Sequence, residues 1–291
     1  MSSSLSADVA VDLRVQPVDE VLDRVERSLQ VRLDRETLVR KRRTVGARTD
    51  RDTWVRVERR RIDKISSQGW NGFECAATLG GIVKPAWYAC VAWGERYGAV
   101  MWRADETELL PAEPVKPGGV LTDDPKLPDT WWDTLSSSLD ALAAQYTSRV
   151  ATPDTVTITQ NVVTDAICSV FPGPLDTTIG CWAPAHADMN WANVTGPEFC
   201  LFDWEDWGMA PRGLDSASLW GNSLAVPALA ERVWHERRRD LESRDGMLMM
   251  LFFCTKIVGP HAHPEDPRLE PARRAAARIV ENLREAPSGL A

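Results

Sequence analysis

Paired cysteines are missing from this sequence. Six cysteines occur among its 291 residues, at positions 75, 90, 168, 181, 200 and 254, and none forms a CxxC pair or a zinc-binding spacing. Disulfide frameworks and structural zinc sites depend on such patterns, so both are disfavoured. We expect reduced, mostly buried thiols and a cytoplasmic location.

Long hydrophobic runs and an excess of positive charge are absent too. The longest apolar run, residues 247–254, is too short to cross a bilayer. The first ten residues have no basic stretch followed by an apolar core, so we expect no secretory signal and no membrane partner. The net charge of −8 makes a nucleic-acid partner improbable for the whole chain and mildly favours cationic substrates.

Against these absences stands one chemically specific segment. Asp188 and Asn193 are five residues apart, and Asp203 follows a short apolar stretch, residues 199–202. A kinase catalytic loop uses this Asp-to-Asn gap, with the Asp receiving the proton of the substrate hydroxyl and the Asn binding magnesium. Carboxylate and amide oxygens are suitable magnesium ligands. A hairpin that turns at residues 196–197 could bring the three groups together.

The wider segment 186–215 resembles the aminoglycoside phosphotransferase and choline kinase-like family, whose members read roughly H-G-D-L-H-x-x-N, an apolar run, then D-W-E and a later D-L-A. The resemblance implies ATP (or GTP) and Mg²⁺ as cofactors, Asp188 as the catalytic base, and Asn193 and Asp203 as metal ligands. It also implies that His186 orients the loop. Asp215 either braces this loop or is an ordinary carboxylate at a helix start.

The same resemblance implies an α+β, bilobal protein-kinase-like fold. We expect residues 1–110 to form a small antiparallel-sheet lobe that binds the nucleotide, and residues 111–291 a mainly helical lobe with a catalytic hairpin at 186–206. The first lobe should contain a helix at 17–30, strands at 37–40, 53–58, 87–93 and 98–102, and turns at 44–50 and 94–97.

Nucleotide contacts in the first lobe are predicted with one departure from the family pattern. The strand that should carry an anchoring lysine carries Arg56, which we pair with Glu74 on the helix expected at 73–79. Lys64 is a second candidate. The alternative for Arg56 and Glu74 is plain surface charge. Residues 102–106 are expected to connect the lobes, so that the backbone at Trp102, Arg103 and Ala104 would bind adenine.

Helical periodicity dominates the second lobe after an irregular Pro- and Gly-rich segment, 111–128. One apolar face runs from Trp132 to Tyr146 and another contains Val162, Ala166 and Val170. Further helices are expected at 214–225, 227–243, 247–258 and 267–286.

Tryptophans and acids surround the catalytic segment. Such rings can stack on a planar or amine-bearing substrate, although they more often pack in a core. The candidate substrate contacts are Trp191, Glu205, Asp206 and Trp207.

Three functions fit these features. The first is phosphorylation of a hydroxyl on a small molecule, such as an amino-sugar antibiotic or another amine-bearing metabolite. The second is phosphorylation of Ser or Thr in a peptide during natural-product maturation, with the basic runs 40–43 and 59–61 binding an acidic leader. The third is a pseudokinase that only binds or scaffolds. The oligomeric state stays open.

Overall fold

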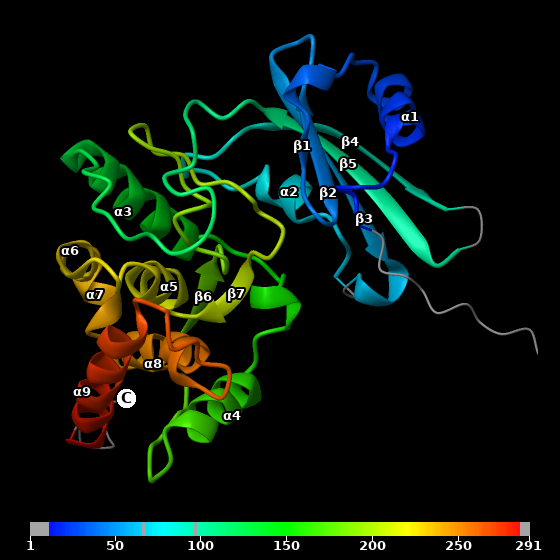
Figure 1. The fold of residues 1–291 in the computed structure, drawn as a ribbon. Helices are drawn as coiled ribbons and strands as arrows, with labels where there is room; N and C mark the ends of the chain where they lie inside the picture. The colour runs from blue at the N-terminus through cyan, green and yellow to red at the C-terminus, as the bar shows by residue number, and fades with distance from the viewer. Residues whose placement is uncertain (1–11, 66–67, 96–97, 286–291) are drawn as a thin grey trace, which may run out of the picture. The chain divides into compact units, whose positions relative to one another are not determined.

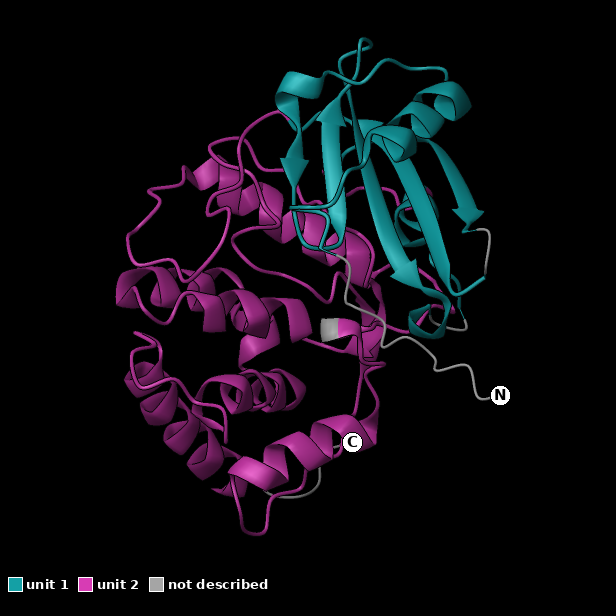
Figure 2. Cartoon of the chain, turned by 45° about the vertical axis from the view of Figure 1, so that its right-hand side comes forward, with its two compact units in different colours: residues 1–77, 85–110 teal, residues 78–84, 111–291 magenta. Residues whose placement is uncertain are grey.

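The computed structural model describes residues 12–65, 68–95 and 98–285. The expected absence of a signal in residues 1–10 therefore falls outside the described residues, as does part of the turn expected at 94–97. The chain divides into two compact units (Figure 2). Unit 1 comprises the described residues of Met1–Ala77 and Pro85–Leu110, and unit 2 those of Thr78–Lys84 and Pro111–Ala291. Residues 78–84 thus lie in unit 2, although they precede the boundary expected at residue 111.

Unit 1 is built on one antiparallel sheet with the strand order β1-β2-β3-β5-β4 (Figure 1). Its strands are β1 Val39–Arg40, β2 Thr44–Arg48, β3 Thr53–Arg61, β4 Trp87–Gly94 and β5 Val100–Glu108, and its helices are α1 Asp19–Leu29 and α2 Gly72–Ala76, with short 3₁₀ turns at Arg35–Thr37 and Ile62–Lys64. The expected α+β class is confirmed.

Helix α1 covers one face of this sheet because its apolar side chains recur at helical spacing. Leu22 and Val25 are buried against the alternating apolar residues of β2 and β3, including Val45, Val55 and Val57. Acidic residues occupy the first turn of α1, where the helix dipole favours negative charge. The opposite face of β3 carries Trp54 and the charged side chains of Arg56 and Glu58, which is the alternation expected of a strand.

The turn expected at 44–50 is wrong, because residues 44–48 form strand β2. Gly46 lies within this strand, opposite Arg56 of β3. A Cβ atom at Gly46 would lie 2.3 Å from the indole of Trp54, so the glycine makes room for a ring and does not form a turn. The strand expected at 37–40 shrinks to the two residues of β1.

Unit 2 is mainly helical, with one two-stranded sheet. Its helices are α3 Asp129–Ala143, α4 Gln160–Val170, α5 Leu214–Asn222, α6 Pro227–Glu236, α7 Arg238–Leu241, α8 Arg244–Val258 and α9 Leu269–Glu285; a 3₁₀ turn spans Pro153–Thr155, and strand β6 Trp182–Ala185 pairs with β7 Gly208–Pro211. The helix expected at 227–243 is broken near Arg237, and Ala286 of the last expected helix lies outside the described residues.

The buried side chains show which face of each helix packs against the rest of unit 2. Helix α8 is buried along most of its length and packs against α5, where Gly221 accommodates the ring of Phe253. Tyr146, which we placed on an apolar face, follows α3 and is 99% exposed. On α4 the buried stripe is Val163 and Ile167, one residue further along than expected.

Two further features concern the chain as a whole. All six cysteines are among the described residues and are thiols; Cys200 and Cys254 are buried, whereas Cys168 and Cys181 are exposed, so the expectation of mostly buried thiols is wrong. No helix among the described residues combines the length and the apolar character that a membrane crossing requires.

Candidate active site

The loop that carries Asp188 is fixed from below by Asp215, near the start of α5. The buried Asp215 carboxylate accepts hydrogen bonds from the backbone N–H of His186 (2.7 Å) and of Ala187 (2.8 Å). Burial raises the pKa of Asp215, opposed by its contacts with His186 and Ala187. Ala187 has a φ of 70°, which is uncommon for a residue other than glycine. Of our two interpretations, Asp215 is therefore the brace of this loop.

His186 links the two halves of the catalytic hairpin. Its Nε2 lies 2.9 Å from the carbonyl oxygen of Phe202, the residue before Asp203. The ring is completely buried and packs edge-on against Trp204. Burial lowers the pKa of His186, so the imidazole is neutral at pH 7 and Nε2–H can donate to that carbonyl. These contacts support the predicted orienting role of His186.

Two side-chain amides hold the carboxylate of Asp188. Asn190 donates from Nδ2 to Oδ1 at 3.0 Å, and Asn193 donates from Nδ2 to Oδ2 at 2.7 Å. Asn193 Nδ2 also lies 2.8 Å from the Asp188 carbonyl oxygen. These bonds limit rotation of the carboxylate.

The hairpin that joins Asn193 to Asp203 has the predicted course. The N–H of Phe202 donates to the carbonyl oxygen of Asn193 (3.0 Å), and Val194 bridges Leu201 in antiparallel register. The backbone of Asp203 then turns with a φ of 67°. The hairpin thereby brings Asn193 and the residue before Asp203 directly opposite each other.

The donor set at the end of this hairpin suits a hard divalent cation. The Asn193 amide is anchored through Nδ2, and among the described residues its Oδ1 accepts no hydrogen bond. Together with the Asp203 carboxylate it offers oxygen ligands of the kind Mg²⁺ prefers. No group of three or more His, Cys, Asp or Glu side chains with metal-binding geometry occurs in the described part of the chain. A magnesium ion at this position would therefore take its remaining ligands from water and phosphate oxygens.

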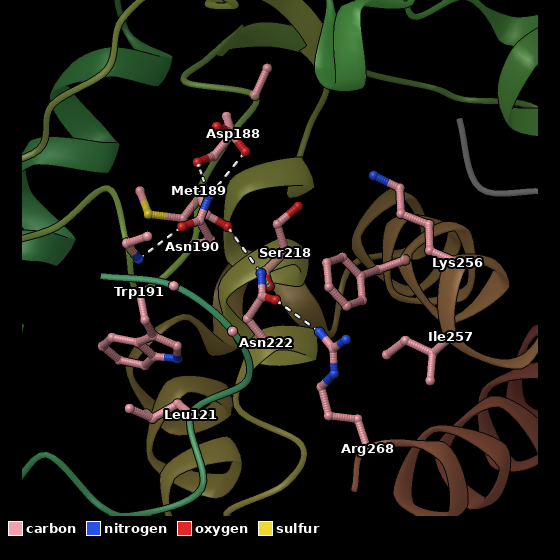
Figure 3. Close-up of a pocket in the computed structure, with 15 residues that line it drawn as sticks. Leu121, Asp188, Met189, Asn190, Trp191, Ser218, Asn222, Lys256, Ile257 and Arg268 are labelled. Carbon is pink, nitrogen blue, oxygen red and sulfur yellow. Dashed lines mark hydrogen bonds between the residues drawn. The ribbon is translucent and has the colours of Figure 1, made fainter. Parts of the chain in front are cut away.

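A cavity of about 340 Å³ opens beside Asp188 within unit 2 (Figure 3). Its walls come from the catalytic loop, from Ser218 and Asn222 of α5, from Lys256 and Ile257 of α8, and from the segment after Lys116. That segment follows the loop closely, since the N–H of Lys116 donates to the Trp191 carbonyl oxygen at 2.9 Å. The volume matches a small-molecule ligand.

The predicted tryptophan contacts are mostly core packing. The ring of Trp191 borders the cavity, but the residue is only 3% exposed, stacks on Trp131 at 5.8 Å and donates from Nε1 to Ser223. Trp207 is 2% exposed and packs against Trp204. Trp207 does not border the cavity, whereas Trp191 does, so only Trp191 remains a predicted substrate contact at this cavity.

The two predicted acidic contacts do not line this cavity. Asp206 Oδ1 accepts a hydrogen bond from the Thr152 hydroxyl at 2.7 Å, and the Asp206 carbonyl oxygen accepts the N–H of Thr152. Glu205 is half-buried in the same turn. Neither carboxylate is among the residues that border the cavity.

In unit 1 the predicted ion pair between Arg56 and Glu74 is wrong, because the cation that contacts Glu74 is a different arginine. Arg103 of β5 contacts Glu74 (3.3 Å) and binds Asp105 through two hydrogen bonds of 2.6 and 2.7 Å. Arg56 instead contacts the buried Glu58 at 3.0 Å. The strand register explains the exchange, because Arg103 lies opposite Glu58 while Arg56 lies opposite Asp105, so both guanidinium groups share one sheet face.

Arg103 is less exposed than Arg56 and contacts two carboxylates. Burial by itself lowers the pKa of Arg103, but the carboxylates of Asp105 and Glu74 outweigh burial and raise it. The side chain is 9% exposed. Its charge is therefore permanent and its orientation fixed.

Residues 102–106 are not the expected connector. They lie in the middle of β5, which pairs with β3 on one side and β4 on the other and continues to Glu108. Trp102 belongs to the core under α1, and its ring stacks on Trp93. The backbone at Trp102, Arg103 and Ala104 is thus engaged in the sheet, and its predicted role in adenine binding is wrong.

No family model and no curated protein matches this sequence. Solved structures do match its fold. Amicoumacin kinase hAmiN, in complex with AMP-PNP, Ca2+ and Ami, is 12% identical with a TM-score of 0.51, covering 91% of this chain and 94% of its own. Aminoglycoside phosphotransferase APH(4)-Ia is 13% identical with a TM-score of 0.52, covering 94% of this chain and 100% of its own. A thermostable mutant of that phosphotransferase, in ternary complex with ADP and hygromycin B, is 16% identical with a TM-score of 0.51, covering 93% and 100%.

The chain has the fold of these kinases. The predicted bilobal, protein-kinase-like architecture is confirmed by this likeness over nearly the whole chain. At such low sequence identity the likeness establishes the fold and not the activity. The roles of individual residues therefore depend on the site geometry described above.

Several residues of this region were not predicted. Asn190 fixes the second oxygen of Asp188, and its place two residues after that Asp was the only available signal. Asn222 joins the loop to Arg268, donating to the Met189 carbonyl oxygen (3.4 Å) and accepting from Arg268 Nη1 (3.1 Å) (Figure 3). No local pattern connects Asn222 with Arg268, because the two are 46 residues apart.

Proposed function

We propose that this protein is an ATP- and Mg²⁺-dependent phosphotransferase that phosphorylates a hydroxyl group of a small molecule. The observation that carries the proposal is the restrained Asp188 carboxylate, held by Asn190 and Asn193 at the edge of a cavity of small-molecule size. The fold shared with known small-molecule kinases supports the same reaction class.

Asp188 would act as the general base. The acceptor oxygen forms a bond to the γ-phosphorus while the bond between that phosphorus and the β–γ bridging oxygen breaks. ADP leaves with the electron pair, and the hydroxyl proton passes to Asp188 and later to water. General-base assistance of this kind contributes roughly 10²- to 10⁴-fold to the rate.

Asn193 would serve two purposes. Its Nδ2 donates to the Asp188 carboxylate and restrains it. Its Oδ1 would be a magnesium ligand, together with the carboxylate of Asp203. A bound Mg²⁺ would neutralise charge on the nucleotide phosphates. Base and metal ligand are thus coupled through one amide, and the hairpin fixes both by the Asn193–Phe202 backbone bond.

For unit 1 we keep the prediction that a guanidinium group contacts the nucleotide phosphates. Arg56 is the accessible candidate, with a side chain 23% exposed. Arg103, held by Asp105 and Glu74, would position that sheet face. Glu74 keeps the predicted role of an anchoring carboxylate, with Arg103 as its partner. Arg can bind phosphate in a bidentate manner, so the missing lysine need not prevent nucleotide binding.

One observation favours a second candidate, a binding module without phosphotransfer. The guanidinium groups of Arg56 and Arg103 already contact carboxylates, Arg56 with Glu58 and Arg103 with Asp105 and Glu74. Nucleotide phosphates would have to compete with them for Arg56. A protein with this arrangement could keep the kinase fold and bind a different partner.

Nucleotide binding separates the two candidates. Thermal unfolding is followed with ATP or GTP, with and without Mg²⁺, for the native protein and for Asp203→Ala, since a ligand of the folded state raises the melting temperature. A Mg²⁺-dependent rise that Asp203→Ala loses supports the phosphotransferase. Asp133→Ala, which changes an exposed carboxylate of α3, is the matched control and should keep the rise. No rise with either nucleotide would favour the binding module.

A further inference from the structure

The charges around the cavity differ in sign from those of the whole chain. Among the described residues that border it, Asp188 is the only carboxylate, whereas Lys256 and Arg268 are cations. The chain as a whole carries a net charge of −8. An acceptor in this cavity therefore meets a local environment that the overall composition does not predict.

Arg268 is held rigidly at one side of the cavity. Asp266 binds it through Nε at 3.0 Å and Nη2 at 2.8 Å, and Nη1 donates to Asn222. Asp266 offsets part of the Arg268 charge but does not border the cavity. A guanidinium fixed in this way keeps its remaining N–H groups in a constant direction, which reduces the entropy lost when it binds an anion.

Lys256 supplies the second cation from α8. Its stem lies near the rings of Phe252 and Phe253, with the ammonium 5.6 and 5.9 Å from the ring centres. In Figure 3 Lys256 is drawn at the upper right of the pocket, Asp188 at the upper left and Arg268 below both. Lys256 is exposed and borders the cavity, so its positive charge lies at the cavity wall.

We propose that the acceptor carries an anionic group, a carboxylate or a phosphate, in addition to the hydroxyl that is phosphorylated. The proposal rests on the phosphotransferase function and names the substrate class of that same site. An amine in this cavity would meet Lys256 and Arg268 as like charges. Its only bordering carboxylate would be Asp188, which must stay available to the reacting hydroxyl.

This substrate class differs from the one suggested by composition. The acidic balance of the chain and the nearby Glu205 and Asp206 favoured an amine-bearing acceptor. Those two carboxylates do not border the cavity, and Asp206 is bonded to Thr152. The anionic group is expected to contact Lys256 or Arg268 while the hydroxyl faces Asp188.

The test uses four sugar-sized probes that differ mainly in one group: glucuronate, a glucose phosphate, glucosamine and glucose. Binding to the full chain is measured by calorimetry without nucleotide, and phosphoryl transfer from ATP is measured separately. A charge-assisted hydrogen bond is worth about tenfold or more in affinity. Glucuronate or the glucose phosphate should bind about tenfold more tightly than glucosamine, and comparison of these two distinguishes carboxylate from phosphate.

Charge variants connect the preference to the proposed cations. Lys256→Gln should reduce the anionic preference, and Lys256→Glu should reverse it toward glucosamine. Arg239→Gln removes an exposed cation of α7 from the same unit and should change nothing. Glucosamine binding at least as tightly as the anionic probes overturns the proposal, as does no binding of either anionic probe at high millimolar concentration.

The two proposals fail in different ways. If Mg²⁺–ATP binds but glucosamine is preferred, the anionic acceptor is wrong and the phosphotransferase stands. If the anionic probes bind through Lys256 while neither ATP nor GTP binds, the pocket assignment stands and the phosphotransferase is wrong.

Discussion

Replacement of Asp215 by Asn should damage both the stability of unit 2 and the position of Asp188. The Asp215 carboxylate accepts two buried backbone N–H groups, from His186 and Ala187. An amide has one acceptor oxygen, so one of these N–H groups would face an NH₂ group. Leaving a buried donor unsatisfied costs about 1–3 kcal/mol. With the loss of a charged acceptor we expect about 2–4 kcal/mol of lost stability.

Asp245 offers a matched control in the same unit. Its carboxylate also accepts two backbone N–H groups, from Gly180 (3.0 Å) and Cys181 (2.7 Å). The two aspartates are buried alike, with Asp215 7% and Asp245 8% exposed. Asp245→Asn should therefore lower stability by a similar amount, but its carboxylate does not contact the loop that carries Asp188.

The assay measures urea unfolding and the turnover number of both variants with the same acceptor. A displacement of about 1 Å at a reacting group can reduce the rate roughly 10²-fold, so Asp215→Asn should lose about that factor in kcat. Asp245→Asn should stay within about twofold at a temperature where both variants are folded. Equal loss of turnover in both variants would refute the positioning role, and unchanged stability of Asp215→Asn would refute the importance of the two hydrogen bonds.

Two further changes test the fold around the site. Because burial lowers the pKa of His186, the unfolded chain binds its proton first, so stability should fall as pH drops below about 6.5, by up to about 1.4 kcal/mol per pH unit. Urea unfolding between pH 7 and 5 should show this slope reduced in His186→Gln but kept in the exposed-site variant His235→Gln; equal slopes would contradict the burial argument. Gly46→Ala should lose about 1–3 kcal/mol in thermal unfolding, because its Cβ would overlap Trp54. Gly118→Ala, with no atom within 4 Å of the added Cβ, is the control, and equal effects of the two alanines would contradict the contact.

Sequence reasoning succeeded where the chemistry is local. The segment from His186 to Asp215 contains both the loop of Asp188 and the carboxylate that braces it. One continuous motif was therefore enough to predict the hairpin. The amphipathic helix α1 was predicted for a similar reason, since helical spacing directly reports a buried face.

Sequence reasoning failed where partners come from distant segments. Gly46 is typical of a turn when the sequence is considered alone. Its actual role is to leave space for the Trp54 ring on the neighbouring strand, and this cross-strand contact is not visible in the sequence. Glu74 could meet Arg56 or Arg103, and only the register of β3 with β5 decides between them.

Two other errors have their own physical origin. Strand β5 was ended too early because its polar residues, including Asp105 and Glu106, are buried, which sequence polarity does not reveal. The positive charges at the cavity were not predicted because Lys256 and Arg268 lie far from Asp188 in the sequence and meet its loop only in the folded chain.

Transfer of labelled phosphate from ATP tests the central claim most directly. The protein is incubated with γ-labelled ATP, Mg²⁺ and an acceptor mixture that contains carboxylate- and phosphate-bearing sugars, beside Asp188→Asn and the control Asp133→Asn. Label should pass to a small acceptor with the native protein and with Asp133→Asn, and fall at least about 10²-fold with Asp188→Asn while nucleotide binding persists. Equal transfer by Asp188→Asn and the native protein, or no transfer to any acceptor although ATP binds, would contradict the account.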